Sequence, residues 1–149
     1  MTISDYIQAI VTELFPTASY QYGRNTDFNI NGDNTSSPVV LCIEPDQQYI
    51  NLNPVSGNVY DGYNLFLRFL QLIPNMDIAE QAPTRVSAIA LQKLNAATFI
   101  AQLSQDDKFI DLPNIIPVIP VIEAYDGNWF GVEINLKNLQ TIKPFDICL

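Results

Sequence analysis

The sequence predicts a single α+β domain over residues 1–149, in which a mostly antiparallel sheet packs with an N-terminal helix and one long helix, and a β-hairpin closes the chain. Apolar residues recur at three-and-four spacing in two segments, which is typical of helices. Short strand-like runs separated by turn-forming residues fill the rest, and hairpin turns favour antiparallel pairing. At 149 residues the chain has the length of one ordinary domain.

The first helix is expected within residues 3–14, where Ile3, Ile7, Ile10, Val11 and Leu14 line one side. Thr2 or Ser4 can cap it, and Pro16 ends it because proline has no backbone N–H. Strands and turns follow. We expect strands at 19–22, 28–31, 38–44, 49–53 and 64–70, with turns at 23–25, 32–38 and 54–58.

The second helix is the longest element, and we expect it to start at Pro83-Thr84, with Thr84 as its cap, and to run to about Gln105. A loop at 106–108 should follow. The small residues of this second helix permit its close approach to a sheet or to another helix. The expected apolar face consists of Val86, Ile89, Ala90, Leu94, Ala97, Ile100, Ala101 and Leu103.

The closing hairpin is predicted from Asp126-Gly127-Asn128, which separates strand-like runs at 117–125 and 130–136. Gly tolerates the positive φ that tight turns require, so an Asp-Gly pair between such runs is a strong hairpin signal.

Composition excludes several classes of function. The chain has no histidine, which removes Ser-His and Cys-His nucleophile pairs and His-ligated zinc. Cys42 and Cys148 match no metal-ligand spacing, and Cys42 lies in an apolar run typical of a buried strand. We therefore expect no enzymatic activity and no cofactor, and reduced rather than disulfide-linked cysteines.

Charge points away from nucleic-acid binding. The net charge is −9, and no two of the seven basic residues are adjacent, whereas gripping phosphates needs clustered cations. Only 15% of residues are charged, against roughly 25% in typical domains. Such a surface is easiest to explain if neighbouring subunits cover part of it.

Three local patterns are weighed against simpler interpretations. Residues Asp27–Asp33 place oxygen-bearing side chains at alternate positions before a glycine, as in the first half of a calcium loop. Pro38 occupies the position where such a loop has a bidentate Glu. A strand followed by an Asx turn is therefore favoured. Tyr20–Arg24 resembles a base-stacking site, but packing is favoured. Glu123, Asp126 and Glu133 crowd the final hairpin, where solvated carboxylates are more common than catalytic ones.

The N-terminus lacks the basic and apolar regions of a signal peptide. No apolar run approaches the roughly 20 residues of a membrane span. We expect no membrane association.

The order of elements resembles that of tail-terminator and neck proteins of tailed bacteriophages. The resemblance rests on the N-terminal helix, the segment Tyr20–Asn29, the strand Asn64–Leu70, the helix Arg85–Leu103 and the closing Gly131–Leu136. The similarity is strongest to proteins of Bacteroidales phages and prophages such as the crAss-like phages. It covers nearly the whole chain but includes no diagnostic motif.

The resemblance implies a structural virion protein that forms a homo-oligomeric ring in the phage neck or tail and is assembled in the bacterial host cytoplasm. DNA would pass through its lumen without specific binding, and portal, neck or tail proteins would be its neighbours. The candidate inter-subunit contacts are Arg24, Asp33, Asn34, Ser56, Asn58, Phe145 and Ile147.

Three alternatives remain open. A carboxylate enzyme would need a concave pocket that gathers Glu123 or Glu133 with a second acid. A monomeric phage assembly chaperone would share the acidic charge and the lack of catalytic groups. A small calcium- or ligand-binding module would use Asp27–Asp33.

Overall fold

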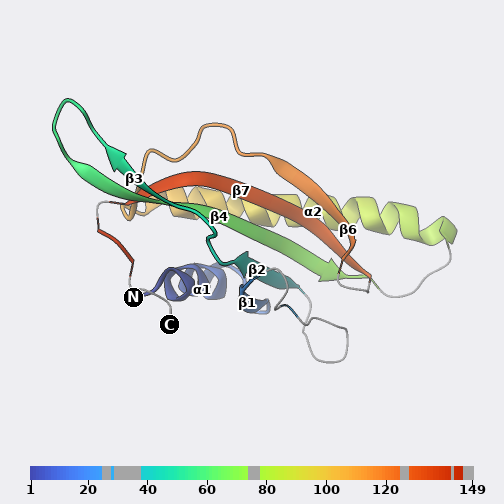
Figure 1. Cartoon of the computed structure of the whole chain (residues 1–149). Helices are drawn as coiled ribbons and strands as arrows, with labels where there is room; N and C mark the ends of the chain where they lie inside the picture. Colours follow the sequence, from blue (N-terminus) through green and yellow to red (C-terminus); the bar gives the residue numbers. More distant parts are fainter. Residues whose placement is uncertain (25–27, 29–37, 74–77, 125–127, 142, 146–149) are drawn as a thin grey trace.

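The computed structural model describes residues 1–24, 28, 38–73, 78–124, 128–141 and 143–145, which form two helices and one seven-stranded sheet (Figure 1). All strand pairs among them are antiparallel except β1–β2. The predicted α+β class is therefore confirmed. The elements are α1 (Ile3–Leu14), β1 (Ser19–Gly23), β2 (Val39–Ile43), β3 (Gln48–Leu52), β4 (Val59–Leu72), α2 (Ile78–Gln105), β5 (Phe109–Ile110), β6 (Val118–Ala124) and β7 (Trp129–Thr141).

Two long neighbouring strands, β4 and β7, form the centre of the sheet, with 14 and 13 residues. The other edge of β4 pairs first with β3, at Val59–Tyr63, and then with β2, at Phe66–Leu70. The other edge of β7 pairs with β6 and, at its C-terminal end, with β5. The sheet is therefore wide at one end, whereas the β3–β4 hairpin extends from the other end (Figure 1).

Both helices contribute to one core on one face of the sheet. Phe69 of β4 shows this directly, because its ring lies 6.2 Å from that of Phe15, just after α1, and 5.7 Å from that of Phe99 in α2. Alternate residues of β2, β4 and β7 point to this side, as the two-residue period of a strand requires. A smaller cluster of Val39, Leu41, Leu70 and Trp129 lies apart from it. Cys42 is fully buried, as predicted.

The predictions for α1 are confirmed. Thr2 is the N-cap: its hydroxyl accepts a hydrogen bond from the backbone N–H of Asp5, and the Asp5 carboxylate accepts one from the backbone N–H of Thr2. Ile3, Ile7, Ile10 and Val11 are buried, and the helix ends before Pro16.

The predicted start of α2 is wrong. The helix begins at Ile78, so Pro83 and Thr84 lie inside it. Proline has a helical φ, and near a helix N-terminus its missing N–H removes only one hydrogen bond. The predicted end at Gln105 and the turn at 106–108 are confirmed.

The strands predicted at 19–22, 38–44, 49–53 and 64–70 are present, and β4 is longer than expected. Phe28 lies outside any strand, and the rest of the strand expected at 28–31 lies outside the described residues. The β6–β7 pairing confirms the closing hairpin, although Asp126 and Gly127 of its turn are not described. β7 continues to Thr141, where it pairs with β5, a strand that was not predicted.

Candidate interaction surfaces

The chain offers little chemistry in the regions that the structure describes. Over these ranges no group of three or more His, Cys, Asp or Glu residues could hold a metal ion. The calcium candidate Asp27–Asp33 lies outside them except for Phe28, which packs partly buried beside the Trp129 cluster. Ion binding there stays a prediction.

Of the three hairpin carboxylates, Glu133 is described in full. It faces Arg68 directly across β4 and β7, with 2.9 Å between Arg68 Nε and Glu133 Oε1. Each side chain is only 19% exposed. The Glu133 carboxylate is therefore held in an ion pair, whereas the sequence predicted a solvated carboxylate. Asp126 and the side chain of Glu123 lie outside the described residues.

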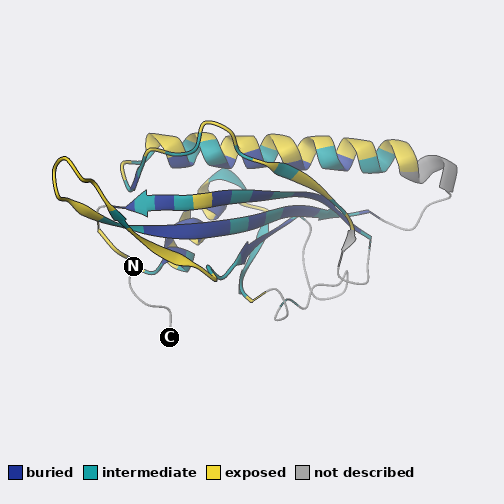
Figure 2. Cartoon of the chain, turned by 45° about the horizontal axis from the view of Figure 1, so that its top comes forward, coloured by how far each residue is buried: buried dark blue, intermediate teal, exposed yellow. Residues whose placement is uncertain are grey.

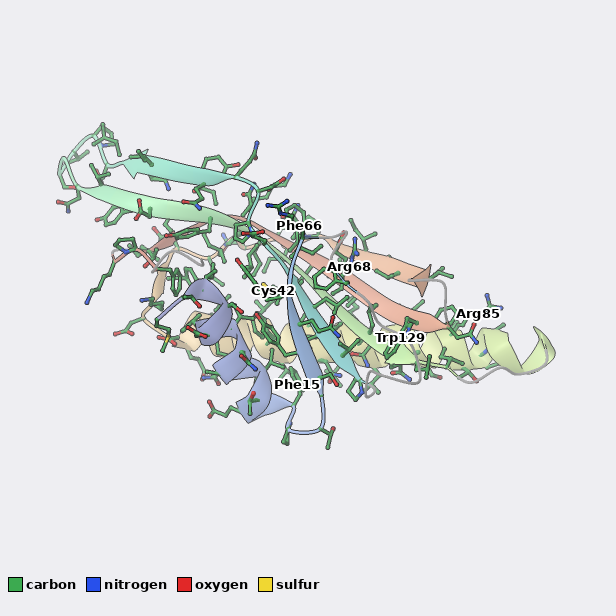
Figure 3. All side chains as sticks on the ribbon, turned by 60° about the horizontal axis from the view of Figure 1, so that its bottom comes forward. Phe15, Cys42, Phe66, Arg68, Arg85 and Trp129 are labelled. Carbon is green, nitrogen blue, oxygen red and sulfur yellow. The ribbon has the colours of Figure 1, made fainter. Side chains whose placement is uncertain are left out.

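This ion pair borders a groove of about 380 Å³ beside β2 and β4. Phe66 and Arg68 project from neighbouring positions of β4 in this region (Figure 3). The groove mixes apolar side chains with opposite charges and contains no thiol or imidazole. Three acidic residues, Glu44, Asp46 and Glu133, line it together. Its lining residues are Arg24, Ile43, Glu44, Asp46, Phe66, Arg68 and Glu133.

The first exposed apolar surface is on the β3–β4 hairpin, residues 48–63, which we call the arm. Leu52 pairs directly with Val59, and Ile50 is two residues away on the same side of β3, so the three share one face. The exposed fractions of Ile50, Leu52 and Val59 are 81%, 64% and 57%, and that of Val55 in the turn is 96%. Exposed residues follow one another around the tip of the arm (Figure 2), whereas Gly62 and Tyr63 at its base are buried.

Neither of the two helices in the described residues covers this face of the arm at its tip. Tyr63, on the same side of β4 as Val59, packs its ring 5.7 Å from that of Phe145 in the helix-covered core. The face that α1 and α2 cover therefore continues into the arm, but the arm reaches past both helices (Figure 1).

The second exposed apolar surface is the side of α2 turned away from the sheet. Val86, Leu91 and Leu94 are 69%, 49% and 63% exposed, and exposed positions follow one another along this side of the helix (Figure 2). The expected apolar face is thus divided between two sides. Its exposed members are Val86, Ala90, Leu94, Ala97 and Ala101, whereas the buried residues between Ala82 and Gln105 are Ala88, Gln92, Ala96, Phe99 and Leu103.

The candidate inter-subunit residues are spread over the molecule. Arg24 lies beside Glu44, with 3.7 Å between Nε and Oε2, at the sheet edge. Ser56 and Asn58 are exposed in the arm's turn, where the Ser56 hydroxyl accepts a hydrogen bond from the Asn58 N–H. Asp33, Asn34 and Ile147 lie outside the described residues.

Phe145 is not the reaching side chain that its position near the C-terminus suggested. It is 8% exposed and its ring centroid lies 5.6–5.7 Å from those of Tyr6, Tyr63 and Phe109. The segment after β7 brings it back over the core of its own subunit.

The sequence did not predict that the apolar residues of the arm and of the outward side of α2 are exposed. Val86 and Leu94 were expected on the apolar face of the helix, and in the arm only Ser56 and Asn58 were candidate contacts. Ile50 and Leu52 alternate as in any half-buried strand. The one feature of the sequence that indicated these exposed surfaces was the low number of charged residues in both segments. The arm has one charged residue, Asp61, and residues 82–105 have two, Arg85 and Lys93.

Two tyrosines combine burial with a hydrogen bond near α1. The Tyr6 hydroxyl donates to Asp106, with 2.7 Å between the oxygens, and burial raises the pKa of Tyr6 well above its usual range. Burial likewise raises the pKa of Tyr20, whose hydroxyl donates to the backbone carbonyl of Ser4. Both side chains pack in the main core, where Tyr6 is buried and Tyr20 is partly buried.

Neither helix in the described part of the chain has the length and apolar composition needed to cross a bilayer. No protein-family model matches the sequence, and no curated protein sequence matches it.

Proposed function

We propose that the protein is a non-enzymatic structural subunit that assembles with copies of itself into a ring. The observation that carries this is the outward side of α2, where Val86, Leu91 and Leu94 lie exposed on one helix. Apolar surface of this kind is stabilised when a neighbouring subunit removes it from water. A ring follows when the interface joins two different surfaces and the rotation closes.

We place this ring in the neck or tail of a tailed phage, next to portal, neck or tail proteins. The support is the resemblance in element order from Tyr20–Asn29 to Gly131–Leu136 and the net charge of −9. An acidic wall repels phosphates, which leaves DNA free to move through a lumen.

The proposal is tested by native mass spectrometry over a range of concentrations, with negative-stain images of the same samples. We expect closed rings. Leu94→Asp places a charge in the exposed side of α2 and should shift the protein to monomer. Gln8→Asp, on the exposed side of α1, should leave the rings intact. A monomer at every concentration would favour the assembly-chaperone alternative instead.

A further inference from the structure

We propose that the arm of one subunit docks on the outward side of α2 in the next. This inference rests on the proposed assembly and names the two surfaces that meet. Both are exposed and apolar, and on one molecule they cannot meet, since α2 turns this side away from the sheet that bears the arm (Figure 2).

The two surfaces have complementary architecture. The arm presents Ile50, Leu52 and Val59 on the sheet face that α1 and α2 cover elsewhere in the fold. The outward side of α2 presents Val86, Leu91 and Leu94, with the small residues Ala90 and Ala97 between them. A helix on a sheet face is the packing that this chain already uses on the other side of α2.

Charge favours the same pairing. Residues 82–105 carry Arg85 and Lys93 and no acidic residue, whereas the arm carries only Asp61. The net charge of −9 is therefore concentrated outside these segments. Arg85 lies over the Phe130 ring of its own subunit, 5.9 Å from the ring centroid. Lys93 is therefore the exposed cation of residues 82–105. Two copies repel each other over most of their surfaces, but Lys93 on the outward side of α2 attracts Asp61 of the arm.

The arm is also ordered before it binds. In its turn, the Asn53 side chain accepts hydrogen bonds from the N–H groups of Val55 and Ser56, 3.0 and 3.3 Å away, and Gly57 takes a φ of 73°. Asn51 ties β3 to Asn138 of β7. Less conformational entropy is lost on docking when the bound shape already exists.

The arm and the outward side of α2 are different surfaces. Each subunit therefore docks its arm on one neighbour and binds the arm of another neighbour on its α2. This arrangement is head-to-tail. It produces a ring when the rotation between neighbouring subunits closes, and an open filament when it does not. A symmetric dimer, in which arm meets arm, would leave α2 uncovered.

The test uses cysteine cross-linking in the full chain. Cys148→Ser removes one of the two native cysteines, and Cys42 can stay because it is buried. One preparation carries Val55→Cys and a second Ala97→Cys; both positions are exposed. The two are mixed at a concentration where native mass spectrometry shows assembly, and then oxidised. The matched control replaces Ala97→Cys with Glu13→Cys on the exposed side of α1.

We expect mixed disulfide dimers at least fivefold above the control mixture. If the protein assembles but forms Val55–Val55 dimers, or mixed dimers no more abundant than in the control, the arm–α2 interface is wrong while the assembly proposal stands. If the protein is monomeric at every concentration, both proposals are wrong.

Discussion

Asn51 and Asn138 bind each other through a reciprocal pair of side-chain hydrogen bonds. The Asn51 Nδ2 lies 2.9 Å from the Asn138 Oδ1, and the Asn138 Nδ2 lies 3.0 Å from the Asn51 Oδ1. Asn138 has a φ of 50° and lies where the β4–β7 register shifts. Asparagine adopts such a conformation more readily than most residues. This pair fixes the arm to the centre of the sheet.

Asn51→Ala should destabilise the fold by about 1 kcal/mol, because the Asn138 amide loses both partners in a half-buried site. Urea unfolding measured below the concentration at which subunits associate checks this. Gln8→Ala, at an exposed position of α1, is the control and should change the free energy of unfolding by less than about 0.5 kcal/mol. Equal effects of the two substitutions would contradict a role for the pair.

Gly131 lies in the middle of β7, between β4 and β6, where an added Cβ would overlap the backbone carbonyl of Phe69. Gly131→Ala should therefore cost about 3 kcal/mol, since the backbone of a central strand cannot move aside. Gly57→Ala is the comparison, because nothing lies within 4 Å of its Cβ. Its cost should be about 1 kcal/mol, from the positive φ alone. Thermal unfolding of the two variants should separate these values.

Arg68→Met should destabilise the protein by about 2 kcal/mol, because it leaves the largely buried Glu133 carboxylate without its partner. The double variant Arg68→Met/Glu133→Met should recover part of that loss. Glu44→Gln is the contrast, since the Arg24–Glu44 pair is longer and its side chains are 79% and 43% exposed. That change should have an effect below about 0.5 kcal/mol. Similar losses at the two pairs would show that burial does not decide their strength.

Stability should fall as the pH rises above about 10. Burial raises the pKa values of Tyr6 and Tyr20 above the ordinary value of 10.0, so the unfolded chain loses these protons first. Their contribution is fully present below pH 10 and is lost as the pH rises toward the folded-state pKa values. Urea midpoints from pH 8 to 11 should show the decline. Tyr6→Phe should make it shallower, and an unchanged slope would rule out Tyr6 as a cause.

Phe145→Ala should lower the free energy of unfolding by about 3 kcal/mol, as for other buried aromatic residues. The reason is its packing against Tyr6, Tyr63 and Phe109 within one subunit. Denaturation at concentrations where the protein is monomeric measures this. If the Phe145→Ala monomer has the same free energy of unfolding as the unmodified monomer, Phe145 is again a candidate inter-subunit contact.

The sequence was sufficient for α1 but not for α2, and the reason is the distribution of apolar residues. In α1 they occupy one side, so the buried side could be predicted. In α2 apolar residues occur on both sides: Phe99 faces the sheet, whereas Leu94 faces away. Periodicity shows that a helix has apolar sides but does not show which of them meets the sheet.

The arm could be predicted as a hairpin but not as an exposed surface. Ile50 and Leu52 alternate with polar residues as they would beneath a helix. Their exposure arises because β4 is longer than the part of the sheet that the helices cover. That length depends on the pairing of β4 with β7, which joins residues 61–72 to residues 129–141 and leaves no local signal.

β4 also has a mechanical consequence. One continuous strand runs from the arm into the core and pairs with β7 from Asp61 to Leu72. A pull on the arm along this strand would load many hydrogen bonds side by side, because they lie perpendicular to the strand, rather than breaking them one at a time. The arm is therefore attached to the body of the protein in a geometry that resists tension along β4.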